Sequence, residues 1–210
     1  MVNITYEDIG KLQQGSLWDF CDKILYDMCK NHLSHCKQDV IIGKLLLIGR
    51  SYSAAIERNI QTEVKSDDCY LKVAETLLRE QHKLDEQIQK LKSYNQITRE
   101  TLPQIINIHK YLLELIRETT GHENRVFVSK YLHFHVPNMF YIYDSQANTK
   151  INNYVSVDKN IKNELLLLEP QGDNEYLKFV AKAFSFNIKI NNEFSTWLTP
   201  RQIDNLLLGY

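Results

Sequence analysis

The sequence lacks a strong net charge, a long apolar run and a leader segment. Its 210 residues carry 25 Lys and Arg against 26 Asp and Glu, which gives a formal net charge of -1. Overall electrostatics therefore does not favour nucleic-acid binding, and any such binding has to come from a local site. No apolar run approaches the roughly 20 residues that span a bilayer. The first residues, MVNITYEDIG, lack the basic and apolar blocks of a signal peptide, so we expect a cytoplasmic protein without membrane contact.

Paired cysteine motifs are also missing, because the four cysteines, Cys21, Cys29, Cys36 and Cys69, form no CxxC pair. Without an export signal, we expect free buried thiols instead of disulfides. Cys29, His32 and Cys36 lie at i, i+3 and i+7 and share one helix face, which leaves a metal site open as an alternative. Zinc sites usually draw ligands from two segments, so ordinary packing is the simpler interpretation. We predict no metal and no cofactor.

What the chain does have is helical periodicity. Its 43% hydrophobic and 24% charged residues are ordinary for a globular protein with a real core. Apolar residues recur at helical spacing over long stretches, and capping residues mark several starts and ends. The expected helices cover 7–34 with a break at Gly15, 38–58, 67–93, Thr101 to Gly121, 124–135, a segment starting at Asp144, 160–168, 173–188, and a last helix with Thr199 as N-cap and Pro200 in its first turn.

These stretches predict an all-α, mostly helical chain. Residues 1–210 should form a single compact domain, which two closely packed helical lobes would also satisfy. The stretch 38–58 is apolar nearly all round in its first half, so we expect a central buried helix there. The alternating segment FSFNIKI leaves short strands open near the C-terminal end.

The segment SKYLHFHVPNMFYIYDSQA, residues 129–147, places a lysine and a carboxylate at the two ends of an aromatic run. Lys130 has apolar neighbours, and loss of hydration lowers the pKa of a lysine and gives a nucleophilic amine. Asp144 stands at an expected helix start, where a carboxylate holds an amine or stabilises positive charge on a sugar ring. The structural alternatives are a snorkelling lysine and a plain N-cap, and capping is compatible with catalysis.

The pattern SKYL at 129–132, an apolar run, a proline and DSQA at 144–147 resembles the core of the helix-hairpin-helix DNA glycosylase superfamily. It is similar, more narrowly, to bacterial 8-oxoguanine glycosylase-like proteins, and the segments GRSYSAAIER and PRQIDNLLL extend the likeness over most of the chain. The resemblance implies a two-lobed helical bundle with the site between the lobes. It also implies Lys130 as nucleophile and Asp144 as the essential acid.

The same resemblance implies a DNA partner. Hairpins of the superfamily hold a phosphate on the N–H groups of a Gly-x-Gly pair, whereas TTGHENRVFVSK has one glycine, so side-chain donors would substitute. The expected DNA contacts are Gly121, His122, Asn124, Arg125 and Ser129. A base has to leave the duplex to be attacked, and the candidates for lining its pocket are Trp18, Arg50, Tyr52 and Trp197.

Arg50 and Glu57 lie seven residues apart in the second expected helix. Buried charges need partners. A structural ion pair with another helix is therefore the alternative to a contact between Arg50 and a phosphate or a flipped base.

Two functions of different classes remain. The first is a DNA N-glycosylase that removes an oxidised or otherwise modified base, in repair or in defence against phage, and attack by Lys130 would also permit strand cleavage. The second is a non-catalytic helical interaction module of a bacterial defence or toxin system, which the near-neutral charge and the one-glycine hairpin favour. A metal enzyme built on Cys29, His32 and Cys36 is a third option.

Overall fold

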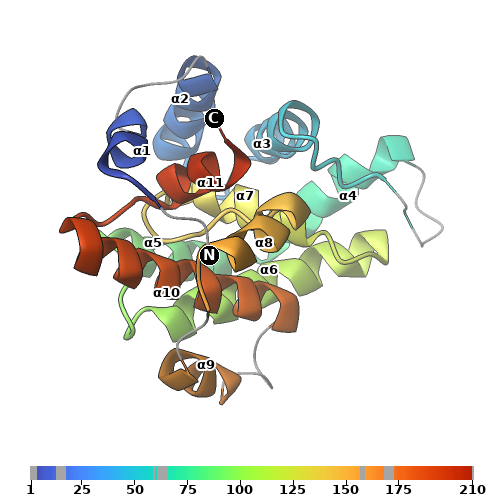
Figure 1. Ribbon diagram of the computed structural model, residues 1–210. Helices are drawn as coiled ribbons and strands as arrows, with labels where there is room; N and C mark the ends of the chain where they lie inside the picture. Colours follow the sequence, from blue (N-terminus) through green and yellow to red (C-terminus); the bar gives the residue numbers. More distant parts are fainter. Residues whose placement is uncertain are drawn as a thin grey trace.

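The computed structural model describes residues 4–12, 18–58, 60, 66–156, 159–167 and 173–209, with the backbone alone at 18–21, 66–67, 162 and 166. Within these ranges every regular element is a helix (Figure 1), so the prediction of an all-α chain is confirmed. In chain order the elements are α1 Tyr6–Lys11, α2 Trp18–Asn31, α3 Gln38–Ser51, α4 Ser66–Arg79, α5 Gln81–Lys92, α6 Leu102–Thr120, α7 Arg125–His135, α8 Ser145–Lys150, the 3-10 turn η1 Ile151–Asn153, α9 Lys159–Leu166, α10 Asn174–Phe194 and α11 Pro200–Leu208.

Helix α6 is the central element of the fold, and α4, α5 and α7 pack against it. Its bounds follow local signals in the sequence. Thr101 is the N-cap, Pro103 lies in the first turn, and Gly121 ends the helix with φ 69°. Glycine enters this left-handed region without the strain that a side chain would bring. The predicted helix from Thr101 to Gly121 is therefore confirmed.

Two expectations about helices are wrong, and the open alternative of strands at FSFNIKI is excluded. Helix α3 is not central, because Leu46 and Leu47 are 39% and 40% exposed and only one face is buried. The stretch 67–93 forms two helices that separate at Glu80. FSFNIKI lies inside α10, where Phe184, Phe186 and most of their neighbours are buried. A helix that is covered on most sides loses its 3.6-residue pattern, and a short piece of it then resembles a strand.

Helices α7, α8 and α11 position the candidate site. Helix α7 packs against α2, α3 and α6, and α11 packs against α8. In Figure 1, α11 lies over α7, between α2 and α8. Within the described part of the chain, no helix is long and apolar enough to cross a membrane.

Candidate functional site

Ser129 joins the two segments that carry the predicted catalytic pair. It is fully buried in α7. Its hydroxyl accepts the backbone N–H of Tyr143 at 3.0 Å and donates to the carbonyl of Val126 at 3.0 Å. The next residue after Ser129 is Lys130, and the next after Tyr143 is Asp144. One buried hydrogen bond thus sets the two predicted residues on neighbouring segments.

Lys130 is half-buried in α7. Its amine donates a hydrogen bond of 2.9 Å to the carbonyl of Tyr52, the residue that ends α3. Burial lowers the pKa of Lys130, the charges of Asp144 and Asp204 oppose that shift, and Arg201 adds to it. Loss of hydration outweighs the two carboxylates, and it favours the neutral amine that acts as a nucleophile.

Asp144 is the N-cap of α8, as the sequence predicted. Its carboxylate accepts the backbone N–H of Gln146 at 2.8 Å. The residue is half-buried, so it reaches solvent as Lys130 does. Asp144 lies close enough for its charge to raise the pKa of Lys130. Both side chains are described, and no ion pair joins them directly.

A second set of charges, on α2 and α11, surrounds the same amine. Arg201 donates to the carboxylate of Asp22 and, at 3.1 Å, to that of Asp204. Asp22 and Asp204 are 2% and 5% exposed. The Oδ1 atom of Asp204 is buried without a hydrogen-bond partner. Burial raises the pKa of Asp204 to about 6, against the opposing charges of Arg201 and Lys130.

Tyr52 connects this set of charges to Lys130. Its hydroxyl donates to Asp22, while its carbonyl accepts the amine of Lys130. Its ring packs against Phe134, with 4.9 Å between the ring centroids. Tyr52, predicted to line a base pocket, therefore contacts the candidate site with its backbone carbonyl and its hydroxyl. Its ring face is in contact with another aromatic side chain.

Sequence reasoning missed Asp22, Arg201 and Asp204. The i, i+3 spacing of Arg201 and Asp204 within the apolar segment PRQIDNLLL was a usable signal, because a charged pair on a buried helix face needs an explanation. Nothing local marked Asp22. It lies 179 residues from Arg201 and is brought there by the packing of distant helices.

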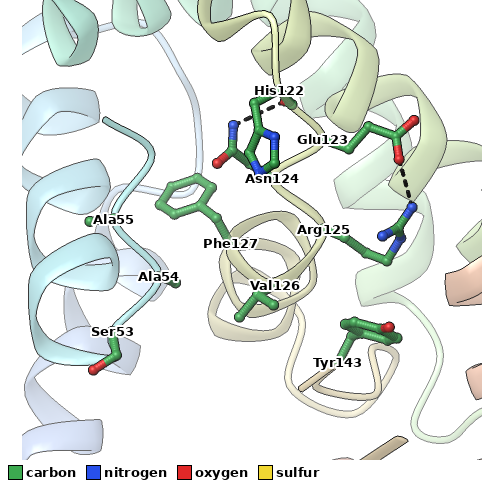
Figure 2. Close-up of a pocket in the computed structure, with 10 residues that line it drawn as sticks. All are labelled: Ser53, Ala54, Ala55, His122, Glu123, Asn124, Arg125, Val126, Phe127 and Tyr143. Atoms are coloured by element: carbon green, nitrogen blue, oxygen red, sulfur yellow. Dashed lines mark hydrogen bonds and ion pairs between the residues drawn. The ribbon is translucent and has the colours of Figure 1, made fainter. Parts of the chain in front are cut away.

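A hollow of about 190 Å³ (Figure 2) is lined by residues that adjoin the pair in sequence, but neither Lys130 nor Asp144 is among the lining residues. The segment Ser53–Ala54–Ala55 faces residues 122–127 across it, and Tyr143 lies at its edge. Ser53 directly follows the carbonyl that holds Lys130, and Tyr143 directly precedes Asp144. The ring of Phe127 points toward the 53–55 segment, so part of the wall is aromatic.

The predicted DNA contacts differ in how much side-chain surface they expose. His122 is half-exposed and lines the hollow. The N–H of Gly121 donates to the carbonyl of Arg117 inside α6. Asn124 is buried, and its amide donates to Thr120 and to the carbonyl of His122. Of these residues, His122 leaves the most side-chain surface for a ligand.

Arg125 and Ser129 are already bound inside the protein. Two guanidinium nitrogens of Arg125 donate to Asp173, one of them at 2.7 Å, and one donates to Glu123 at 2.8 Å. The hydrogen bonds to Asp173 hold the pKa of Arg125 above its ordinary value. Ser129 is fully buried, so it has no surface to offer DNA, in contrast to the expectation.

The other base-pocket candidates are separate from this arrangement. The side chain of Trp18 lies outside the described residues. Trp197 is half-buried, with its ring edge-on to Phe184 at 5.8 Å. Arg50 pairs with Glu57 at 2.5 Å, and Glu57 also accepts the hydroxyl of Tyr70. These contacts favour a structural role for the two charges, but the ion pair joins Arg50 to Glu57 itself and not to another helix, because α3 ends at Ser51 and Glu57 lies in the turn that follows.

The metal alternative finds no support in the arrangement of its three residues. Cys29 is fully buried, and burial raises the pKa of its thiol to about 12. His32 and Cys36 are exposed. Among the described residues, no group of three or more His, Cys, Asp or Glu side chains is placed to hold a metal ion.

Comparison of the chain with protein-family models, with curated proteins and with solved structures finds no match.

Proposed function

We propose that the protein is a DNA N-glycosylase with the two-lobed helical fold of the helix-hairpin-helix superfamily, with Lys130 as nucleophile and Asp144 as the essential acid. The observation that supports this most is the hydrogen bond between Ser129 and Tyr143. It sets a partly desolvated amine beside a helix-capping carboxylate, and both side chains reach solvent. A partly buried lysine with a lowered pKa, near a carboxylate, marks a candidate functional site.

The chemistry follows from the two side chains. Departure of the base leaves positive charge at C1′ of the sugar, and the carboxylate of Asp144 stabilises that charge. The amine of Lys130, or a water, then forms the new bond to C1′. Attack by the amine, with loss of a proton, gives an aminal at C1′, and breaking of the C1′–O4′ bond with protonation of O4′ opens the sugar and leaves a Schiff base, which permits strand cleavage at the abasic site. The substrate class is an oxidised or otherwise modified base in duplex DNA, in repair or in defence against phage.

The hollow lined by Ser53 and Tyr143 is the proposed entry for the flipped nucleotide, which would have to extend beyond it to reach Lys130 and Asp144. Its volume of about 190 Å³ and the aromatic ring of Phe127 suit a base or a sugar. With a formal net charge of -1, binding depends on few phosphate contacts. A shallow dependence of affinity on salt concentration follows from that small number.

The direct test traps the Schiff base. Duplex DNA with an abasic site is incubated with the protein and sodium borohydride, which reduces the imine to a stable amine. The wild-type protein should form a covalent adduct, and Lys130→Gln should form none. Lys182→Gln is the matched control, because Lys182 is also half-buried with a lowered pKa but lies on α10. In a second assay, Asp144→Asn should lose release of the modified base.

The alternative is a non-catalytic interaction module. Exposed apolar side chains on α2, α3 and α4, namely Ile24, Leu46, Leu47 and Leu71, favour contact with another protein. A wild-type protein that gives no adduct and releases no base from damaged or modified DNA would overturn the glycosylase proposal and leave the module.

A further inference from the structure

We propose that Arg201, on the last helix, is a positioning residue that keeps Lys130 available as a nucleophile, because it holds the carboxylates of Asp22 and Asp204 and opposes their charge beside the amine. This role deepens the proposed glycosylase function and rests on it. Arg201 does not touch the substrate in this account. It acts through the charge balance around Lys130.

Arg201 is the guanidinium that both buried carboxylates share. Its Nη1 atom donates to Asp204 at 3.1 Å, and its Nη2 atom donates to Asp22. Both carboxylates are almost completely buried, so the guanidinium replaces the water that they would otherwise bind. The remaining oxygen of Asp204, Oδ1, has no partner. Without Arg201, Asp204 would have no hydrogen-bond donor left on either oxygen.

Besides Arg201, the cation whose charge acts on Asp204 is Lys130. Tyr52 connects Asp22 to Lys130: its hydroxyl donates a hydrogen bond to Asp22, and its carbonyl accepts one from the amine of Lys130. The charge of Asp204 raises the pKa of Lys130, and the charge of Arg201 lowers it. With Arg201 removed, Lys130 loses the positive charge that lowers its pKa and becomes the remaining cation that stabilises the charge of Asp204, so the pair favours the ammonium form and withdraws the amine from attack.

The other groups that face Lys130 do not oppose this argument. Asp144, the N-cap of α8, also raises the pKa of Lys130 and is unchanged in the variants of this test. From α3, the carbonyl of Tyr52 accepts the amine. From α2, Tyr26 bonds to His133, whose pKa burial lowers to about 3, so that imidazole adds no positive charge at neutral pH. Arg201 is thus the only one of these residues whose charge favours the neutral amine at that pH.

The experiment measures the titration of Lys130 by NMR of ¹³C-labelled lysine side chains, with Lys130→Gln identifying the signal. Arg201→Gln should raise the pKa of Lys130 by about one unit. The rate of borohydride trapping at neutral pH should then fall about tenfold and recover at higher pH. Arg201→Lys keeps a cation and should shift the titration less. A merely structural arginine would lower stability without moving the titration.

The double variant Arg201→Gln with Asp204→Asn makes the test specific. Removing the freed carboxylate should return the pKa of Lys130 toward the wild-type value and restore trapping. Circular dichroism checks that each variant is folded. An unchanged titration in Arg201→Gln, or no return in the double variant, overturns the role of Arg201. The titration needs no DNA, so a wild-type protein that traps no substrate would overturn the glycosylase proposal alone.

Discussion

The hydroxyl of Ser129 accepts the backbone N–H of Tyr143 at 3.0 Å, fourteen residues along the chain. This bond ties α7 to the extended segment before α8. Since Lys130 and Asp144 are the next residues on the two tied segments, the bond controls their relative register. The site is therefore set by a buried contact that itself has no access to a substrate.

Ser129→Ala tests this control. The change leaves the N–H of Tyr143 buried without an acceptor, so the free energy of unfolding should fall by about 1–3 kcal/mol. Schiff-base trapping should slow in protein that is still folded, because the register of the two segments is loosened. Denaturant unfolding and the trapping rate are the two measurements.

Ser93→Ala is the control for that variant. The hydroxyl of Ser93 is exposed and donates to a carbonyl at the end of α5. Its loss should change stability by less than about 0.5 kcal/mol. A wild-type trapping rate in Ser129→Ala would contradict the positioning role.

Lys130→Met should abolish trapping without loss of stability. Burial lowers the pKa of Lys130 below its ordinary value of 10.5. The amine therefore binds a proton more tightly in the unfolded chain than in the folded protein. The stability of the wild-type protein therefore rises as pH increases through this window. At neutral pH the free energy of unfolding of the variant should equal that of the wild type or exceed it by up to about 1 kcal/mol. This difference in free energy should shrink toward pH 10.5. Lower stability of the variant at neutral pH would argue that the lysine is structural.

His109→Phe should make the protein more resistant to acid. His109 is fully buried against the ring of Tyr176, with 3.6 Å between the centroids, and burial lowers its pKa to about 3. Below the ordinary pKa of histidine, the side chain of His109 binds a proton in the unfolded chain but stays neutral in the folded protein. Stability falls by about 1.4 kcal/mol per pH unit between roughly pH 6.5 and 3. Phenylalanine keeps the stacked ring and removes this dependence.

Unfolding free energies between pH 7 and pH 4 measure the effect. Gln89→Ala, on the exposed face of α5, removes no titratable group and should keep the wild-type slope. An identical slope in His109→Phe would show that His109 contributes nothing to acid sensitivity.

Asp173→Asn should release Arg125 toward DNA. Asp173 caps α10, and asparagine retains that cap, but the more buried of the two charges that hold Arg125 is lost and only the exposed Glu123 remains as its ion-pair partner. Affinity for abasic-site DNA should rise, and the slope of log affinity against log salt should steepen by about 0.9, the value of one added phosphate contact. Fluorescence anisotropy over a series of salt concentrations measures both. Glu164→Gln, which frees Arg99 near α9, is the matched control, and an equal change there would indicate a general charge effect.

Local chemistry explains which parts of the fold the sequence predicted. Gly121 ends α6, Asp144 caps α8, and Thr199 caps α11, because each of these roles depends on the residue and its immediate neighbours. The break between α4 and α5 at Glu80 has no such residue, and the amphipathic pattern continues across it. Short strands stayed open as an alternative at FSFNIKI because burial on most sides of α10 hides the helical period.

In the candidate site, too, the sequence predicted some residues and missed others. Lys130 and Asp144 were marked by the contrast between single charges and an aromatic run. Tyr52 was expected as a ring and takes part through its carbonyl and hydroxyl. The pairing of Asp22 with Arg201 joins positions 179 residues apart, so no periodicity or spacing could predict it.

The most direct test of the account is to map the residue that carries the trapped DNA. After reduction with borohydride and digestion with nuclease and protease, mass spectrometry locates the modified lysine. The account predicts one modified peptide, with the deoxyribose remnant on Lys130. Modification of another lysine, such as the buried Lys44 or the half-buried Lys182, would contradict it, and so would the absence of any modified peptide.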